Sequence, residues 1–205
     1  MDLPQAIRDA VDTSAITQLI LKERESRDLG RWDDMRDCFH PDSEIRISWF
    51  RGNGADFVTG SIDMARRNVL AKHRLSPIRV TLSGDRAVCT MSAIIEIPVA
   101  LKATAMNLLS YTRFVYRTER REGTWRIVSF DAVYLRDELT PAIPGHSIVI
   151  DPNELKLFRP SYRLLSYVLS QQGYAVDPDL AGEDRPDSIR ALMRGIFTWA
   201  GLKSD

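Results

Sequence analysis

The sequence predicts one α+β domain in which helices pack against a single curved, mostly antiparallel sheet. Three helical segments come first, a long run of strands joined by hairpin turns follows, and two amphipathic helices come last. The chain has 205 residues, which suits one domain with an appendage. We expect a domain over residues 14–137, with residues 138–205 as a loop and two-helix extension of the same domain.

The three helical segments are predicted from apolar residues at helical spacing and from residues that can cap a helix. In the first segment, Ile16, Leu19 and Ile20 recur at the spacing that places them on one helix face. Ser14 and Ser61 are suited to the N-caps of the first and third segments. The predicted helices cover residues 14–27, 32–39 and 61–72.

The strands are predicted from alternating side chains and from the turn residues between apolar runs. Ile45, Ile47 and Trp49 alternate with polar residues over 44–50, as in a strand that is buried on one face. Hairpin turns are expected around Gly84 and around Gly123. The other predicted strands cover residues 74–82, 86–98, 111–118 and 124–136, and residues 100–110 are ambiguous between strand and a short helical piece.

After Glu138 the pattern of strands ends, and a loop and helices are predicted instead. Pro141 and Gly145 belong to a loop, and amphipathic helices are expected over residues 161–172 and 187–201. Each helix needs a surface for its apolar face, and the ordinary outcome is packing on the outside of the sheet or on a neighbouring subunit. A lid over a pocket is the alternative. Because neither helix can bury its apolar face alone, we expect a homodimer or homotrimer.

Composition argues against several classes of function. Lys plus Arg and Asp plus Glu both number 28, so the chain lacks the excess positive charge of most nucleic-acid and anionic-membrane binders. No stretch approaches the ~20 apolar residues of a membrane span, and no basic segment followed by an apolar run opens the chain. We therefore expect a cytoplasmic protein whose partner is a small molecule, with no nucleic acid and no membrane.

The potential metal ligands are few and dispersed. Cys38 and Cys89 have no metal-type spacing, and two buried free thiols are expected. The three histidines are scattered, and the sequence contains no Gly-rich phosphate loop or metal-binding helix motif. We expect neither a metal ion nor an organic cofactor.

Asp28 and His73 are the main candidates for chemistry. Asp28 ends the first helix, whose buried stripe changes from apolar residues to Glu23, Arg24 and Arg27. This change predicts either a helix that enters the interior beside a polar cavity, or a helix that emerges into water with Glu23 and Arg27 as an i,i+4 pair. His73 lies at a junction between helix and strand, where a lone histidine is most often a helix C-terminal residue.

Strand parity adds candidates for a pocket wall. Thr112 and Phe114 face inward if the alternating Arg113 faces solvent. Trp49 and Asp131 are further candidates, although large apolar side chains on strands usually belong to the core. An inward Asp131 would need a partner or a role.

Short motifs stand in a characteristic order along residues 14–137. They are Arg27-Asp28-Leu29-Gly30-Arg31-Trp32-Asp33, the Pro41-Asp42 entry to a strand, Ser83-Gly84-Asp85-Arg86-Ala87 and Arg121-Glu122-Gly123-Thr124-Trp125-Arg126-Ile127. Together they resemble SnoaL-like proteins of the nuclear transport factor 2-like (NTF2-like) superfamily. The resemblance implies a cone-shaped α+β barrel with an internal pocket open at one end. The tail after Glu138 is not part of it.

Within that superfamily, the chain resembles the branch of scytalone dehydratase, γ-hexachlorocyclohexane dehydrochlorinase and the bile acid 7α-dehydratases. Those enzymes use an Asp-His dyad without metal or organic cofactor, and the resemblance implies Asp28 and His73 as the catalytic pair. Five residues before Asp28, where those enzymes carry Tyr or Lys, this chain carries Glu23. The expected substrate-binding residues are Glu23, Trp49, Thr112, Phe114 and Asp131.

Two functions remain open at this point. The first is a cofactor-independent lyase (a dehydratase or related elimination) or an isomerase, acting on a small apolar cyclic substrate. There His73 removes a proton while Asp28 fixes the imidazole tautomer. The second is a non-catalytic small-molecule-binding protein or accessory subunit of the same fold. A hydrogen bond between Asp28 and His73 in a cavity favours the first function, and their separation favours the second.

Overall fold

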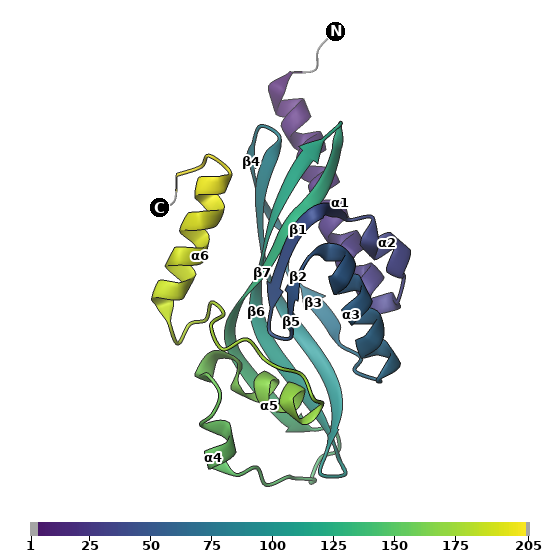
Figure 1. The fold of residues 1–205 in the computed structure, drawn as a ribbon, viewed down its shortest axis with the longest axis vertical. Coiled ribbons are helices and arrows are strands. Elements are labelled where there is room, and N and C mark those ends of the chain that lie inside the picture. Colours follow the sequence, from purple (N-terminus) through teal and green to yellow (C-terminus); the bar gives the residue numbers. More distant parts are fainter. Residues whose placement is uncertain (1–3, 204–205) are drawn as a thin grey trace.

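The structure is a computed structural model that describes residues 4–203, and in that range it contains one curved sheet of seven strands (Figure 1). Hydrogen bonds join the strands in the order β2-β1-β7-β6-β5-β3, and β4 also pairs with β5. Only β1 and β7 pair in parallel. The strands are β1 (Phe39–Ile47), β2 (Phe50–Gly52), β3 (Lys72–Leu75), β4 (Arg79–Ser83), β5 (Arg86–Leu101), β6 (Thr104–Arg121) and β7 (Thr124–Pro141).

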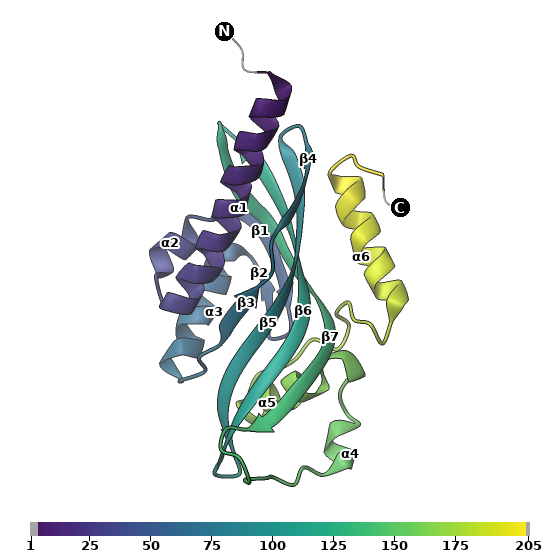
Figure 2. The same ribbon diagram turned by 180° about the vertical axis from the view of Figure 1, so that it is seen from behind.

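Helices cover both sides of this sheet. Figures 1 and 2 show α1 (Gln5–Leu29), α2 (Trp32–Arg36) and α3 (Gly54–Arg66) on one side, and α6 (Pro186–Trp199) on the other. The predicted α+β class with a curved, mostly antiparallel sheet is confirmed. The sheet remains unclosed, because β2 and β3 lie at opposite ends of the strand order.

Two helices begin earlier than the sequence predicted. Helix α1 begins at Gln5, so Ser14 lies inside it. The residues before Ile16 are mostly exposed, and Ile7 and Val11, which lie one turn apart on this helix, are among them. Helix α3 begins at Gly54, where the Asn53 side chain caps it by accepting a hydrogen bond from the Asp56 N–H at 2.9 Å. Ser61, the predicted cap, is therefore buried inside α3.

Other boundaries of the predicted helices and strands differ as well. The predicted helix over residues 32–39 ends at Arg36, and the predicted strand over 44–50 turns at Ser48 and Trp49 into β2. The predicted strand over 74–82 is divided around Pro77, which cannot donate a ladder hydrogen bond. Residues 100–110 are strand apart from a turn at Lys102-Ala103, whose left-handed φ angles are 48° and 63°.

The core lies between the concave face of the sheet and helices α1 to α3. Aromatic side chains fill much of it, and Tyr116 stacks on Phe130 with ring centroids 4.5 Å apart. A second apolar cluster lies on the convex face, where Val115 of β6 and Val133 of β7 meet Ile196 of α6. The sheet is therefore buried on both faces along its central strands.

The two predicted tail helices take different positions. The tail contains α4 (Pro152–Leu155), a 3-10 turn (Pro160–Tyr162), α5 (Arg163–Gln171) and α6. Helix α6 packs on the convex face, as expected for an ordinary amphipathic helix. Helix α5 instead belongs to the main core cluster, with Leu165 and Leu169 pointing into it. Among the described helices, none is long and apolar enough to cross a membrane.

Candidate active site

Asp28 and His73 meet where the end of α1 lies beside β3. Asp28 accepts two hydrogen bonds from this one residue: Oδ1 from the ring nitrogen Nδ1 at 2.6 Å, and Oδ2 from the backbone N–H at 2.7 Å. Because an ionised carboxylate only accepts, Nδ1 carries the proton and Nε2 is the basic nitrogen. Gly30 ends α1 in the left-handed conformation (φ 72°), so the chain leaves the helix just after Asp28.

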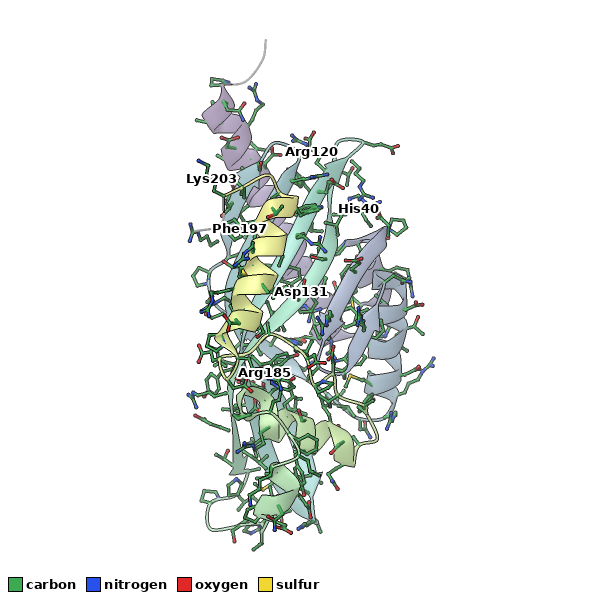
Figure 3. The ribbon with its side chains drawn as sticks, turned by 60° about the vertical axis from the view of Figure 1, so that its left-hand side comes forward. His40, Arg120, Asp131, Arg185, Phe197 and Lys203 are labelled. Atoms are coloured by element: carbon green, nitrogen blue, oxygen red, sulfur yellow. The ribbon has the colours of Figure 1, made fainter. Side chains whose placement is uncertain are left out.

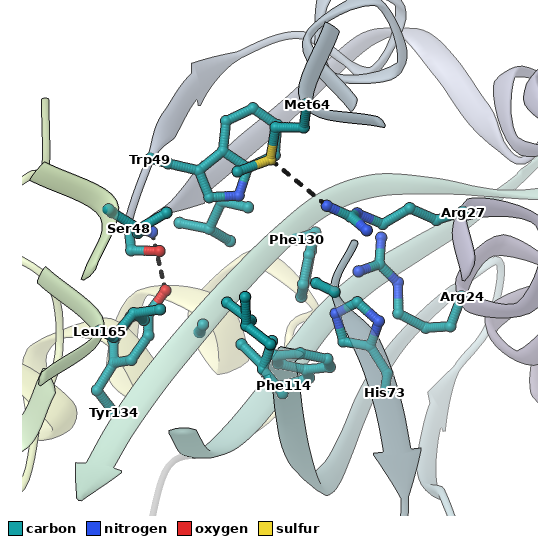
Figure 4. A pocket seen from close by; sticks show the side chains of 16 residues that line it. Arg24, Arg27, Ser48, Trp49, Met64, His73, Phe114, Phe130, Tyr134 and Leu165 are labelled. Atoms are coloured by element: carbon teal, nitrogen blue, oxygen red, sulfur yellow. Dashed lines mark hydrogen bonds between the residues drawn. The ribbon is translucent and has the colours of Figure 1, made fainter. Parts of the chain in front are cut away.

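His73 forms part of the wall of a small internal cavity under the concave face (Figure 4). The cavity has a volume of about 30 Å³, which is room for about one water molecule. A larger ligand therefore requires side chains in the wall to move. The wall consists of Arg24, Arg27, Ile47, Ser48, Trp49, Met64, Ala71, His73, Ile95, Ile97, Phe114, Phe130, Ala132, Tyr134, Leu165 and Leu169.

The dyad also borders a surface cleft of about 670 Å³ between α1 and β3. Asp28 lines only this cleft, whereas His73 and Arg24 line both the cleft and the cavity. Nδ1 of His73 faces Asp28 on the cleft side, and the His73 side chain also forms part of the cavity wall. Arg24 and His73 therefore separate the internal cavity from solvent.

Two arginines of α1 extend into the cavity wall. Glu23 binds Arg24 through two guanidinium N–H groups, and the Arg24 guanidinium lies 4.8 Å from the centroid of the Phe130 ring. Arg27 has no such carboxylate. Among residues 4–203 its hydrogen bond goes to the sulfur of Met64 at 3.6 Å (Figure 4). Burial lowers the pKa of Arg27 to about 10, and the charge of Arg24 adds to this effect.

The pKa of His73 is lowered to about 4, chiefly by burial and in addition by the positive charges of Arg24 and Arg27. The hydrogen bond that His73 donates to Asp28 opposes this shift without cancelling it. Burial acts against the charge of Asp28, but the hydrogen bonds from His73 outweigh it and lower the pKa of Asp28. Near neutral pH the pair is a carboxylate and a neutral imidazole.

Four of the five proposed substrate-binding residues lie on the expected side of the sheet, but only two of them line the cavity. Trp49 and Phe114 are in the wall. Thr112 is buried on the Phe114 side of β6, where its hydroxyl donates to the carbonyl of Ala93 at 3.1 Å, and it is not in the wall. Glu23 is fully buried, is bound to Arg24 and is also outside the wall.

Asp131 lies on the opposite face of the sheet, so its placement in the cavity is wrong. Phe130 and Ala132 point into the cavity, and the residue between them must point the other way. Its cross-strand partner is Val115, and Figure 3 shows Asp131 beside the strip that α6 covers. Burial raises the pKa of Asp131 to about 6, against the opposing effect of Arg117.

The burial of the polar end of α1 settles how this helix ends. Glu23, Arg24 and Arg27 are 0%, 2% and 8% exposed, so the helix enters the interior instead of emerging into water. The alternative ion pair between Glu23 and Arg27 is not formed. Tyr134 of β7 was missed as a wall residue. Its hydroxyl accepts a hydrogen bond from the Ser48 N–H at 2.8 Å, and its inward parity follows from pairing with Thr112.

The other histidines and the cysteines lie away from the cavity. His40 is buried with Nε2 3.0 Å from the carbonyl oxygen of Glu119, and His146 is exposed in a loop. Cys38 and Cys89 are buried and free. Within the part of the chain that the structure describes, no three His, Cys, Asp or Glu side chains form a group that could hold a metal ion.

The sequence profile of the SnoaL-like domain matches residues 8–131. The chain belongs to the SnoaL-like domain family. This SnoaL-like chain is 30% identical over 180 residues to an uncharacterised protein of Aspergillus terreus, covering 79% of this chain and 66% of that protein. It is also 25% identical over 164 residues to pea pathogenicity protein 2 of Fusarium vanettenii, covering 76% of this chain and 70% of that protein.

Solved structures share the fold of this SnoaL-like chain. A provisionally named scytalone dehydratase from Novosphingobium aromaticivorans has a TM-score of 0.57 at 12% identity, covering 70% of this chain and all of that one (100%). A hexachlorocyclohexane dehydrochlorinase from Novosphingobium barchaimii has a TM-score of 0.55 at 17% identity, covering 71% of this chain and 99% of that one. The resemblance read from the sequence motifs is confirmed at the level of family and fold.

Proposed function

We propose that this chain is a cofactor-independent lyase or isomerase whose first chemical step is removal of a proton from carbon by His73. The observation that carries the proposal is the 2.6 Å hydrogen bond between His73 Nδ1 and Asp28 Oδ1. It holds the ring in one tautomer and leaves Nε2 as the base. This is the arrangement that general-base catalysis by a histidine requires.

In the proposed step, Nε2 takes the proton and the electron pair of the C–H bond stays on the substrate. In an elimination, that pair forms a carbon–carbon double bond and the leaving group departs with its own bonding pair. In an isomerisation, the imidazolium returns the proton to a different carbon. Asp28 stabilises the imidazolium in either case, because its ionised carboxylate accepts the Nδ1–H bond.

The electrostatics of the site favour a substrate with an activated C–H bond. Because burial and the neighbouring arginines lower the pKa of His73 to about 4, the ring is unprotonated and ready to accept a proton at neutral pH. The same low pKa makes it a weak base, so the proton must come from carbon that is already acidified, for example next to a carbonyl group. The cavity wall is otherwise largely apolar, which suits a small ring.

Hydrogen–deuterium exchange tests the shared step without requiring the natural substrate. Cyclic ketones, β-hydroxy ketones and ring carboxylic acids are incubated with the protein in D2O, and exchange next to the carbonyl is followed by NMR. We expect catalysed exchange in the wild type and its loss in His73→Ala and Asp28→Asn. His146→Ala is the matched control, because His146 is exposed in a loop. Exchange that is equally fast in wild type and His73→Ala would exclude the mechanism.

A non-catalytic binding protein is the second candidate, and Glu23 is the observation that favours it. The resembling enzymes carry a Tyr or Lys at this position, whereas here Glu23 is bound to Arg24 and lies outside the cavity wall. It therefore supplies no second polar group to a substrate. Ligand binding that is unchanged in His73→Ala and Asp28→Asn, together with no exchange or turnover in the wild type, would support this candidate.

A further inference from the structure

Arg27 is a buried cation without a carboxylate partner in the wall of the cavity. Its side chain is 8% exposed, and a guanidinium carries five N–H donors. Within residues 4–203, its hydrogen bond goes to the Met64 sulfur, which is a weak acceptor. Most of the guanidinium N–H donors of Arg27 are therefore available to a ligand in the cavity. Buried charges in proteins are normally paired, because removing a charge from water is costly.

The neighbouring carboxylates are already engaged by other donors. Glu23 binds Arg24 through two N–H groups, and both oxygens of Asp28 accept from His73. Asp28 and Glu23 favour the charge of Arg27 from a distance, but neither accepts a hydrogen bond from it. Arg24 is therefore satisfied within the chain, whereas Arg27 is not.

We propose that Arg27 binds a carboxylate group of the ligand, so that the ligand is a small ring that carries a carboxylic acid. This proposal rests on the proposed function, because it assigns the substrate class of the same cavity. The planar guanidinium can donate two parallel hydrogen bonds to a carboxylate, and such charge-assisted pairs are strong where water is excluded. The apolar wall, including Trp49, Phe114 and Phe130, accommodates the ring.

The position of Arg27 also determines how near a ligand carboxylate lies to His73, the proposed base. Figure 4 shows Arg24 and Arg27 entering the cavity from one side, the side where His73 also lies. A carboxylate on Arg27 therefore brings the attached ring next to His73. It also supplies the counter-charge that the chain does not provide at this position. Arg24, already bound by Glu23, needs no second anion.

Matched acids and amides test the proposal. The probes are acetate, benzoate, cyclohexanecarboxylate and 2-naphthoate, each beside its neutral carboxamide of nearly the same shape. Binding is measured near neutral pH by isothermal titration calorimetry with the full chain. We expect the best-fitting acid to bind about tenfold or more tightly than its amide, a preference of the size that one charge-assisted pair confers. Arg27→Met should abolish this preference and leave amide binding unchanged.

Further variants decide between charge recognition and a change of structure. Arg27→Lys keeps the charge without the planar fork and should retain part of the preference. Arg66→Met is the control, because Arg66 is an exposed arginine of α3. His73→Ala should keep the preference for the acid over its amide, which separates this proposal from the proposed chemistry. Four acids that bind no better than their amides, or a preference that persists in Arg27→Met, would overturn it.

Discussion

The carboxylate of Asp28 holds both the side chain and the main chain of His73, through the ring Nδ1 at 2.6 Å and the backbone N–H at 2.7 Å. One residue thus fixes the orientation of the imidazole and the position of the first strand after α3. The ring cannot turn about its χ angles without losing the first bond, and β3 cannot slide along α1 without losing the second. The dyad is therefore preorganised before any ligand binds.

Asp28→Asn and His73→Ala should both lower kcat by about 10²- to 10⁴-fold. An asparagine side chain cannot accept from both donors with equal strength, and its NH2 group favours the wrong imidazole tautomer. Ligand affinity should change little in Asp28→Asn, because the lost interaction acts mainly in the transition state. Steady-state kinetics and calorimetry measure the two quantities. Asp131→Asn, on the opposite face, is the control and should keep the wild-type rate.

The pH profile of kcat/KM should show its acidic limb near pH 4, because that is where the buried His73 titrates. A limb near the ordinary value of 6.5 would contradict the proposed environment. Arg27→Met should move the limb to higher pH, since the charge of Arg27 lowers the pKa of His73.

The same shift links pH to stability. Between about pH 4 and 6.5 the unfolded chain binds more protons at His73 than the folded chain does. The contribution of His73 to the free energy of unfolding is therefore full above pH 6.5 and is lost as the pH falls towards 4. Chemical denaturation of wild type and His73→Gln at several pH values measures it. A difference between the two proteins that does not vary across this window would contradict the assignment.

Arg27→Met should raise the free energy of unfolding of the ligand-free protein, by on the order of 1 kcal/mol. The substitution removes a buried charge that has no bonded counter-ion, and it replaces that charge with an apolar side chain of similar length. Urea denaturation of both proteins measures the difference. A structural role for Arg27 predicts the opposite sign, so destabilisation by this substitution would argue that an interaction within the chain had been lost.

Leu169→Ala should enlarge the cavity, and it should shift the preference of the protein toward bulkier ligands. It should also reduce the free energy of unfolding by about 2 to 5 kcal/mol, because Leu169 is 1% exposed. Val168→Ala is the matched control, since Val168 is equally buried on the same helix but lies outside the cavity wall. The control should lose stability without a change in size preference, as measured by binding of the graded acids. A preference that shifts equally in both variants would contradict the assignment of Leu169 to the cavity wall.

Much of the fold could be predicted because turn residues mark where the strands end. Gly84 and Gly123 marked the β4–β5 and β6–β7 hairpins. The start of α1 could not be predicted in this way, because its N-cap position is Pro4, which makes no side-chain capping hydrogen bond. The apolar stripes of α5 and α6 predicted two helices, but periodicity does not say which surface a helix covers. That choice depends on which face of the sheet each one meets.

The candidate dyad could be inferred from the order of the motifs, whereas the charged side chains around it could not. Glu23 and Arg27 have the spacing of an ordinary i,i+4 pair, yet Glu23 binds the adjacent Arg24 instead. Only the packing of α1 against the aromatic core decides between these partners. Asp131 was misplaced for a simpler reason: its parity relative to Phe114 depends on the register between β6 and β7, which single-strand alternation does not contain.

The cavity wall joins a part of the chain that the family profile matches to a part that lies beyond the match. The family match ends at residue 131, so the dyad lies inside it and helix α5 lies beyond it. Substitutions of Leu165 and Leu169 would reshape one wall of the cavity without touching Asp28 or His73. Laboratory evolution can use the same division, because libraries confined to α5 would vary the ligand and leave the proposed base unchanged. Lineages that diverge in this tail would keep the proposed chemistry and change the molecules on which it acts.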